Sequence, residues 1–142
     1  NLRAAFLLSN KVACFMRENR YGKIVNISSI QSAICWGGAG EFSPAPYCAS
    51  KAGLNALTRS FALELAPYNI TVNTVCPAVI DGKWAESLKS NKKIYDDILL
   101  RTPMKRLCRH DDIIGPVMLF SSDYGSYITG QCLFVDGGWM IE

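Results

Sequence analysis

The stretch Gly22-Lys23-Ile24-Val25-Asn26-Ile27-Ser28-Ser29 decides the fold class. From Lys23 to Ser28 it is mostly apolar and rich in β-branched residues, which is typical of a strand buried on both faces, as parallel sheets require. Ile70 to Cys76 is a second stretch of this kind, and Gln131 to Val135 is predicted to be the closing strand. The chain therefore offers three strands to one sheet.

Helical patterns separate these strands. Ahead of the first strand, apolar residues recur at helical spacing and end before Gly22; they are Leu2, Phe6, Leu7, Val12, Ala13 and Met16. A second stripe follows Pro46 and ends at Pro67; it consists of Leu54, Leu57, Phe61, Ala62 and Leu65. Strands that alternate with helices predict an α/β fold with a Rossmann-like, doubly wound parallel sheet and right-handed crossovers.

The remaining segments are less regular. Residues 30–46 contain three glycines and two prolines, so we expect a loop there. Residues 82–100 read as a mobile amphipathic segment whose apolar side holds Trp84, Leu88, Ile94, Tyr95, Ile98 and Leu99. Another helix is expected after Asp111 or Asp112, weakened or kinked by Gly115-Pro116.

Composition limits the function. The 142 residues are 49% hydrophobic and 19% charged, with a net charge of +3, which fits one globular domain acting on a small molecule and shows no nucleic-acid footprint. Six cysteines without a Cys-x-x-Cys pair and a single histidine argue against a metal site and favour reduced, buried thiols. The sequence shows neither a membrane-spanning stretch nor a signal peptide, so we expect a cytoplasmic protein.

Tyr47 and Lys51 are four residues apart in Tyr47-Cys48-Ala49-Ser50-Lys51. On a helix, this spacing places both side chains on one face. A nearby cation lowers the pKa of a phenol from its ordinary value of about 10, which suits it to acid–base chemistry near neutral pH. The spacing alone is common on solvated helices, so the surrounding sequence has to decide its meaning.

That surrounding sequence resembles the catalytic half of the short-chain dehydrogenase/reductase family. The strand ending at Ser29 comes first, then the Tyr47 helix, then 73–78 (Asn-Thr-Val-Cys-Pro-Ala), and finally 128–138 with its Ile-Thr-Gly and Val-Asp-Gly-Gly segments. The family's glycine-rich Thr-Gly-x-x-x-Gly-x-Gly turn and its Asn-Asn-Ala-Gly segment do not occur in this sequence. We therefore interpret residues 1–142 as a single, N-terminally incomplete domain of this family.

The resemblance implies roles for four residues. Tyr47 would donate a proton to the substrate oxygen, and Lys51 would lower the pKa of that phenol and hydrogen-bond the nicotinamide ribose. Ser29, at the carboxyl end of the first strand, would hydrogen-bond the substrate carbonyl, with Ser28 as the competing candidate. Asn1 lies 28 residues before Ser29, where the family carries the asparagine that holds a water next to the lysine.

The resemblance also implies a nicotinamide cofactor. The segment Pro77-Ala78-Val79-Ile80 matches the one with which the family contacts the nicotinamide, and the backbone of Ile80 would bind the carboxamide. Ala78 replaces a glycine and Gly82 replaces a threonine of the family pattern, so part of the diphosphate contact is in question. The sequence leaves NAD and NADP both open, because the residue that reads the ribose 2′ position is not in it.

Substrate contacts are expected from the loop after Ser29, which is longer than the family usually shows. Gln31, Ser32, Trp36 and Trp84 are the candidates to line the pocket, although both tryptophans would equally suit packing of their loops. His110 precedes a helix, and we expect it to cap that helix or to lie on the surface.

The leading hypothesis is an NAD(P)-dependent oxidoreductase that moves a hydride between nicotinamide and a secondary alcohol/ketone pair, with a sugar, polyol or related hydroxy compound as substrate. A 3-oxoacyl thioester reductase of the same family is the alternative. A non-catalytic dinucleotide-binding scaffold, or a fragment that only forms oligomers, are alternatives from other classes. We also expect a homo-oligomer, a dimer or tetramer, and a bare edge on the first strand.

Overall fold

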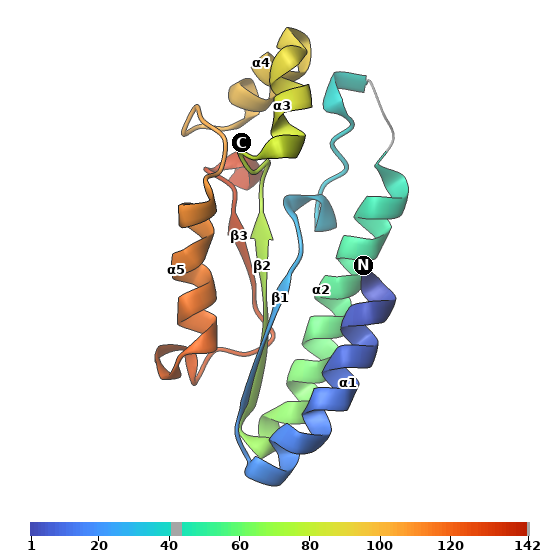
Figure 1. The fold of residues 1–142 in the computed structure, drawn as a ribbon, viewed down its shortest axis with the longest axis vertical. Helices are drawn as coiled ribbons and strands as arrows, with labels where there is room; N and C mark the ends of the chain where they lie inside the picture. The colour runs from blue at the N-terminus through green and yellow to red at the C-terminus, as the bar shows by residue number, and fades with distance from the viewer. Residues whose placement is uncertain (41–43, 142) are drawn as a thin grey trace.

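A computed structural model describes residues 1–40 and 44–141 of the chain (Figure 1). The helices are α1 (Leu2–Asn19), α2 (Ala45–Leu65), α3 (Lys83–Ser90), α4 (Lys92–Arg101) and α5 (His110–Ser121). The strands are β1 (Gly22–Ile27), β2 (Ile70–Pro77) and β3 (Cys132–Val135). The predicted loop 30–46 contains two short 3-10 turns, Ile30–Ser32 and Gly38–Gly40, while residues 41–43 lie outside the described part.

The three strands form one parallel sheet in the order β1-β2-β3. The register pairs Gly22 with Ile70 and Thr74 with Cys132, so the carboxyl ends of the strands lie at the same edge of the sheet. Helices α1 and α2 cover one face, and α5 covers the other (Figure 1). The predicted α/β class and the parallel, doubly wound sheet are confirmed.

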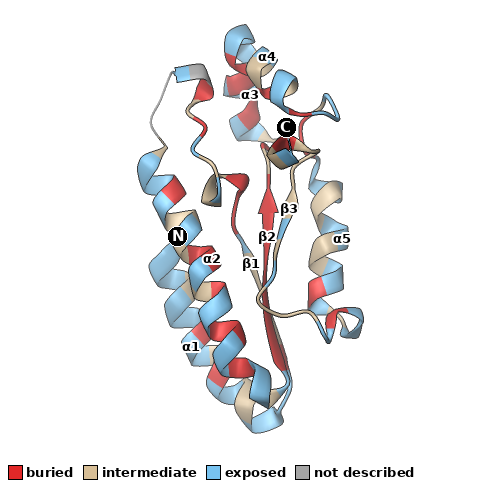
Figure 2. Cartoon of the chain, turned by 180° about the vertical axis from the view of Figure 1, so that it is seen from behind, coloured by how far each residue is buried: buried red, intermediate tan, exposed pale blue. Residues whose placement is uncertain are grey.

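Burial differs sharply between the strands. All eight residues of β2 are buried, because β2 has a neighbouring strand on each side and helices on both faces (Figure 2). In β1 only Gly22 is buried, and Ile27 is 46% exposed. The prediction that the first strand is buried on both faces is therefore wrong for this chain, since β1 is the edge of the three-stranded sheet.

The helix that carries Tyr47 is fixed by its sequence at both ends. Pro46 lies in its first turn, where the missing N–H of proline leaves no gap in the helical hydrogen bonds. Phe61, Ala62 and Leu65 pack with Ala13 of α1 and Val72 of β2 in a hydrophobic cluster. This packing holds α2 firmly against β2, so the first turn of α2 lies beside the carboxyl ends of the strands.

Two predicted segments differ in detail from the structure. Residues 82–100 form two helices, because the Asn91 side chain accepts a hydrogen bond from the Ile94 N–H (3.3 Å) and starts α4 anew. Trp84, expected on the apolar side, is 60% exposed. Helix α5 begins at His110, slightly earlier than predicted, and continues past Pro116 to Ser121.

Candidate active site

A cleft of about 660 Å³ opens where β1 and β2 end. Seven of the residues predicted to act in catalysis, cofactor binding or substrate binding line it: Ser29, Gln31, Trp36, Tyr47, Ala78, Ile80 and Trp84. The other lining residues were not predicted there: Ile30, Pro44, Val79, Gly82, Lys83 and His110. Ligands of open α/β sheets gather at this edge because the strand ends and their loops meet there.

Ser29 is the second residue after the end of β1 and is 8% exposed. Its Oγ accepts a hydrogen bond from the backbone N–H of Gln31 (3.2 Å). The hydroxyl proton therefore stays available for an acceptor in the cleft. Ser28 is placed differently: its hydroxyl donates to the Lys51 carbonyl (3.2 Å), and it does not line the cleft, which favours Ser29 as the functional serine.

Tyr47 lies in the first turn of α2, is 41% exposed and faces the cleft. Lys51 follows one turn later, with its Nζ 5.6 Å from the centre of the Tyr47 ring. The same Nζ donates to the Ile27 carbonyl (2.8 Å), which anchors it at the end of β1. Burial lowers the pKa of Lys51, while the nearby Cys76 thiol acts in the opposite direction.

The turn that carries Ser29 is held from α2 by buried polar groups. The Ser32 hydroxyl donates to the Ser29 carbonyl (2.6 Å). The Asn55 amide in turn donates to Ser32 Oγ (2.7 Å). Ser32 was predicted to line the pocket, but the structure places it behind the pocket, in support of Ser29. Asn55 was not predicted at all, because its partner is 23 residues away in the sequence.

The backbone of Ile80 is suited to bind a carboxamide. Ile80 pairs with Cys108 in an isolated parallel bridge. In this bridge the Cys108 N–H donates to the Val79 carbonyl, and the Asp81 N–H donates to the Cys108 carbonyl. Within the described part of the chain, the N–H and C=O of Ile80 itself have no backbone partner. One free donor and one free acceptor complement the C=O and NH2 of a nicotinamide carboxamide, so these residues fit the cofactor.

Pro77 and Ala78, the other predicted cofactor contacts, differ in exposure. Pro77 is buried at the end of β2 and does not line the cleft, and its predicted cofactor contact stays a prediction. Ala78 lines the cleft, while its N–H donates to the Val135 carbonyl (3.0 Å).

Asn1 lies beside the first turns of α2. Its side-chain amide donates to Ser50 Oγ (3.3 Å), and Ser50 immediately precedes Lys51. Asn1 is exposed and does not line the cleft. This position is compatible with the predicted role at Lys51 and does not test it.

The two tryptophans have different surroundings. Trp36 is 6% exposed, donates its indole N–H to Asp97 (2.6 Å) and meets Trp139 edge to face at 5.6 Å. It therefore joins the loop after Ser29 to α4 while also lining the cleft. Trp84 instead lies on the exposed side of α3, at the rim of the cleft.

His110 is exposed, which confirms the predicted surface position, and it lies at the cleft instead of capping the helix. The N-terminus of α5 is capped by Asp112, whose carboxylate accepts the Arg109 N–H (2.7 Å). His110 lines the cleft next to Gly82. The bridge between Ile80 and Cys108 brings it there, and no local pattern in the sequence indicates that bridge.

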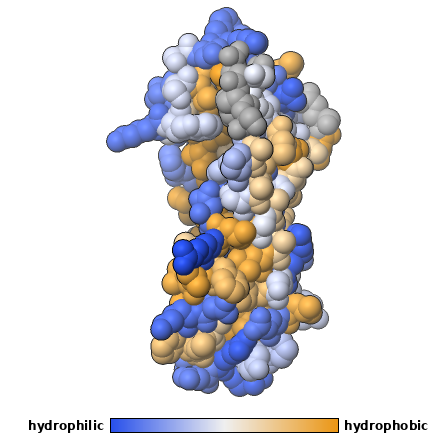
Figure 3. All heavy atoms as spheres, turned by 90° about the vertical axis from the view of Figure 1, so that its right-hand side faces the viewer, coloured by the Kyte–Doolittle hydropathy of each residue, from blue (hydrophilic) through white to orange (hydrophobic). Residues whose placement is uncertain are grey.

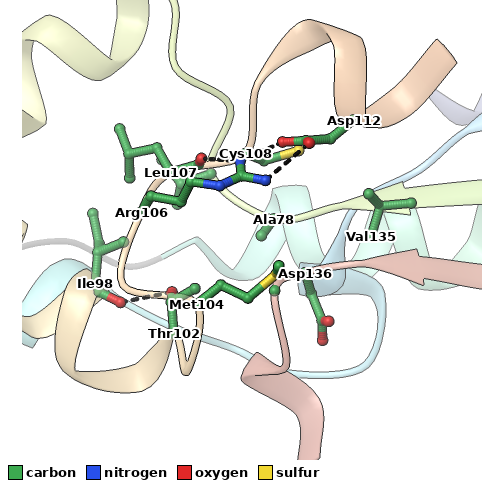
Figure 4. Close-up of a pocket in the computed structure, with 12 residues that line it drawn as sticks. Ala78, Ile98, Thr102, Met104, Arg106, Leu107, Cys108, Asp112, Val135 and Asp136 are labelled. Atoms are coloured by element: carbon green, nitrogen blue, oxygen red, sulfur yellow. Dashed lines mark hydrogen bonds and ion pairs between the residues drawn. The ribbon is translucent and has the colours of Figure 1, made fainter.

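A second cavity of about 220 Å³ lies at the carboxyl ends of β2 and β3 (Figure 4). Arg106 and Asp112 form a two-pronged ion pair at its wall (2.5 and 3.0 Å). Asp136 accepts hydrogen bonds from the N–H groups of Gly138 and Met140. Its charged groups are thus already paired, and the cavity has a structural character.

The described residues contain neither a candidate metal site nor a membrane-spanning helix. In residues 1–40 and 44–141, no cluster of three or more His, Cys, Asp or Glu residues could hold a metal ion. Over the same residues, none of the helices is long and apolar enough to cross a membrane.

Comparison with known proteins agrees with this geometry. A family model described as enoyl-(acyl carrier protein) reductase matches residues 1–140. Over 141 residues the chain is 40% identical to a 3-oxoacyl-[acyl-carrier-protein] reductase of Rickettsia conorii and 34% identical to a 5-keto-D-gluconate 5-reductase of Escherichia coli. Both matches cover 99% of the chain, which spans 56% and 54% of these relatives, about half their length.

A solved structure is similar as well. The gluconate 5-dehydrogenase of Burkholderia cenocepacia in complex with NADP and tartrate matches with a TM-score of 0.90 and 30% identity, over 97% of the chain and 52% of that protein. The fold is an α/β fold of the Rossmann type. The chain belongs to the short-chain dehydrogenase/reductase family, as its sequence resemblance implied.

Proposed function

We propose that this chain is the catalytic part of an NAD(P)-dependent oxidoreductase that interconverts a secondary alcohol and a ketone. One observation carries the proposal: Ser29 and Tyr47 line the same cleft, and the Lys51 ammonium lies behind the Tyr47 ring. A hydrogen-bond donor, a phenol and a cation in this order are what proton transfer to a carbonyl oxygen requires.

In the direction of reduction, the roles divide as follows. The Ser29 hydroxyl donates a hydrogen bond to the substrate carbonyl, since its own acceptor capacity is partly used by the Gln31 N–H. Tyr47 donates a proton to the same oxygen, and the Lys51 charge favours the phenolate that remains. A reduced nicotinamide supplies the hydride when it is bound.

The cofactor is NAD or NADP. The unpaired backbone groups of Ile80 would hold the nicotinamide carboxamide, with Ala78 beside them at the cleft wall. The similar gluconate 5-dehydrogenase was solved with NADP. We propose that the rest of the dinucleotide is bound by the amino-terminal part that the relatives carry. The term complete protein is used for this chain preceded by such a part.

For the substrate we favour a sugar, polyol or related hydroxy compound. The cleft offers the polar side chains of Gln31, Lys83 and His110, in addition to those of Ser29 and Tyr47. Several donors around the reacting carbon suit a substrate rich in oxygen. The similar 5-keto-D-gluconate 5-reductase and gluconate 5-dehydrogenase carry names of this substrate class.

A 3-oxoacyl thioester reductase is the second candidate. It is favoured by the relative with 40% identity, whose name states this activity. Assays of the complete protein with 5-keto-D-gluconate and with an acetoacetyl thioester separate the two. Turnover of the thioester alone would reverse our preference.

Tyr47→Phe in the complete protein tests the catalytic assignment. Phenylalanine keeps the ring and removes the proton, so we expect kcat to fall roughly a hundred- to ten-thousandfold, the usual contribution of a positioned acid or base. The dissociation constant for NADPH, measured by fluorescence titration, should stay within a factor of about three, since a single lost hydrogen bond is small. An unchanged kcat would reject Tyr47 as the proton donor.

A non-catalytic scaffold predicts a different result in the same experiment. Such a protein would bind the dinucleotide and show no turnover with any alcohol or ketone, either before or after the substitution. Turnover by the parent protein that Tyr47→Phe removes is therefore evidence for an enzyme.

We further propose that the protein forms a homo-oligomer through α1 and α2. Large apolar side chains are exposed on these helices: Leu7, Leu8, Phe15 and Leu63. Figure 3 shows hydrophobic atoms gathered over the side where α1 and α2 lie. Burial of such side chains against a second copy would remove apolar area from water.

A cytoplasmic location also stays a prediction, supported by six free cysteines.

A further inference from the structure

Cys48 immediately follows Tyr47 but points away from the cleft, and it is 5% exposed. Its Sγ lies 3.0 Å from Gln31 Oε1 and 3.7 Å from the Ile34 carbonyl oxygen. The Cys35 thiol is a further hydrogen-bonding neighbour. Cys48 therefore connects the first turn of α2 with the turn after Ser29, from behind the cleft wall.

The Cys48 thiol acts as the donor in its contact with Gln31. Burial, followed by the interaction with Cys35, raises the pKa of the Cys48 thiol, so it keeps its proton. A thiol carries one proton, and Gln31 Oε1 is the nearer of its two oxygen acceptors. The contact thus fixes which end of the Gln31 carboxamide faces Cys48.

This fixes the other end of the carboxamide as well. Among the described residues, none accepts a hydrogen bond from Gln31 Nε2, while Gln31 lines the cleft together with Ser29 and Tyr47. A carboxamide whose oxygen faces Cys48 turns its two N–H donors to the other side. On that side the cleft therefore selects a hydrogen-bond acceptor, such as a carboxylate or hydroxyl oxygen.

We propose that Cys48 is a positioning residue: its thiol holds the oxygen of Gln31 so that Nε2 donates to a carboxylate or hydroxyl oxygen next to the reacting carbon of the substrate. The favoured substrate class is thus an oxo acid or hydroxy acid, such as a sugar acid. Lys83 lines the same cleft and complements a negative charge. This inference rests on the proposed function, which it makes more specific.

The test compares Cys48→Ala with Cys48→Ser in the complete protein. With 5-keto-D-gluconate, Cys48→Ala should raise KM roughly three- to tenfold, the value of one hydrogen bond, and leave kcat within about twofold. Cys48→Ser keeps a donor of similar size and should restore KM. With cyclohexanone, which offers no second oxygen, both variants should match the parent. Equal losses on both ketones, an unchanged KM, or no rescue by serine would overturn the inference.

A binding measurement separates this inference from the proposed function. Calorimetry with 5-keto-D-gluconate on Tyr47→Phe needs no turnover. Adding Cys48→Ala to this variant should raise Kd by the same factor by which Cys48→Ala alone raises KM. Full turnover by Tyr47→Phe together with weaker binding after Cys48→Ala would reject the catalytic assignment and keep the positioning role. Loss of turnover together with unaltered binding, or no binding by either variant, would reject the positioning role instead.

Discussion

At the scale of single residues, Ser28 and Ser29 are neighbours with opposite surroundings. The Ser28 hydroxyl donates a hydrogen bond to the Lys51 carbonyl. The Ser29 hydroxyl accepts one from the Gln31 N–H, so its proton is available to a ligand in the cleft. We expect Ser29→Ala to lower kcat roughly a hundredfold or more in the complete protein, as loss of a donor to a developing oxyanion does. Steady-state kinetics of both alanine variants provide the measurement.

Ser28→Ala is the matched control for that prediction. It removes one hydrogen bond between the residue after β1 and α2, so it should cost about 1 kcal/mol of stability and leave kcat within a few-fold. If Ser28→Ala lost more kcat than Ser29→Ala, the two assignments would have to be exchanged.

Local sequence made some of these residues predictable and left others hidden. Tyr47 and Lys51 were predictable because helical spacing alone brings their side chains together. Cys48 and Asn55 were missed, since their partners lie 17 to 23 residues away and depend on how α2 packs on the sheet. For the same reason Ser32 was predicted in the pocket and lies behind it. Contacts of this kind follow from the fold and have no period in the sequence.

At the scale of elements, the N-terminus of α5 is held by a charge. Hydrogen bonds from Arg106, and then from the Arg109 N–H, lower the pKa of Asp112 to about 2 from 3.8. A carboxylate with a lowered pKa stabilises the fold above its unfolded value, and this stabilisation is lost as pH falls from about 4 through about 2. Asp112→Asn should therefore cost stability at pH 7 and progressively less toward pH 3.

Urea unfolding of the parent and of Asp112→Asn between pH 7 and pH 3 measures this difference. Asp111→Asn is the control, because Asp111 lies in the same turn, is exposed and has no ion-pair partner among the described residues. The difference in free energy of unfolding between parent and variant should depend on pH. A difference that stays constant with pH, or that is equally large for Asp111→Asn, would show that the ion pair with Arg106 does not control the stability of α5.

Gly115 offers a second prediction in the same helix. It is exposed, and apart from its chain neighbours and the backbone of its own helix, a Cβ placed on it would meet nothing within 4 Å. Gly115→Ala should therefore raise the free energy of unfolding by less than about 1 kcal/mol, since alanine loses less conformational entropy in a helix but its Cβ crowds the ring of Pro116. Gly125→Ala is the contrast: its Cβ would collide with the Leu119 carbonyl, and denaturant unfolding should show a loss.

Element boundaries show where sequence patterns stop being informative. The division of residues 82–100 into α3 and α4 depends on one cap by Asn91, which is a common loop residue as well. The burial of β1 was overestimated because an apolar strand looks the same in the sequence whether its neighbours are within the chain or outside it. Strand identity and order were predictable, and strand environment was not.

At the scale of the whole molecule, β1 is the decisive element. It is the edge strand of the sheet, so one row of its backbone N–H and C=O groups faces away from β2. The chain also spans only about half the length of its curated relatives. An exposed edge strand is a template for pairing with another chain, so we expect the 142-residue chain alone to associate or aggregate.

The last prediction concerns cofactor binding by the whole molecule. A ligand raises the melting temperature only of the state that binds it, and the unpaired N–H and C=O of Ile80, with the few other cofactor contacts predicted in this chain, are too small a site to hold a dinucleotide. NADPH or NADH at 1 mM should therefore leave the melting temperature of the chain alone unchanged, and the chain alone should show no turnover. The same cofactor should raise the melting temperature of the complete protein by several degrees, because dinucleotides bind across the crevice between the two halves of such sheets. Differential scanning calorimetry of both proteins measures this, with NADPH omitted as the reference. A comparable shift in the chain alone would mean that residues 1–142 contain the whole dinucleotide site, and the role given to the amino-terminal part would then be wrong.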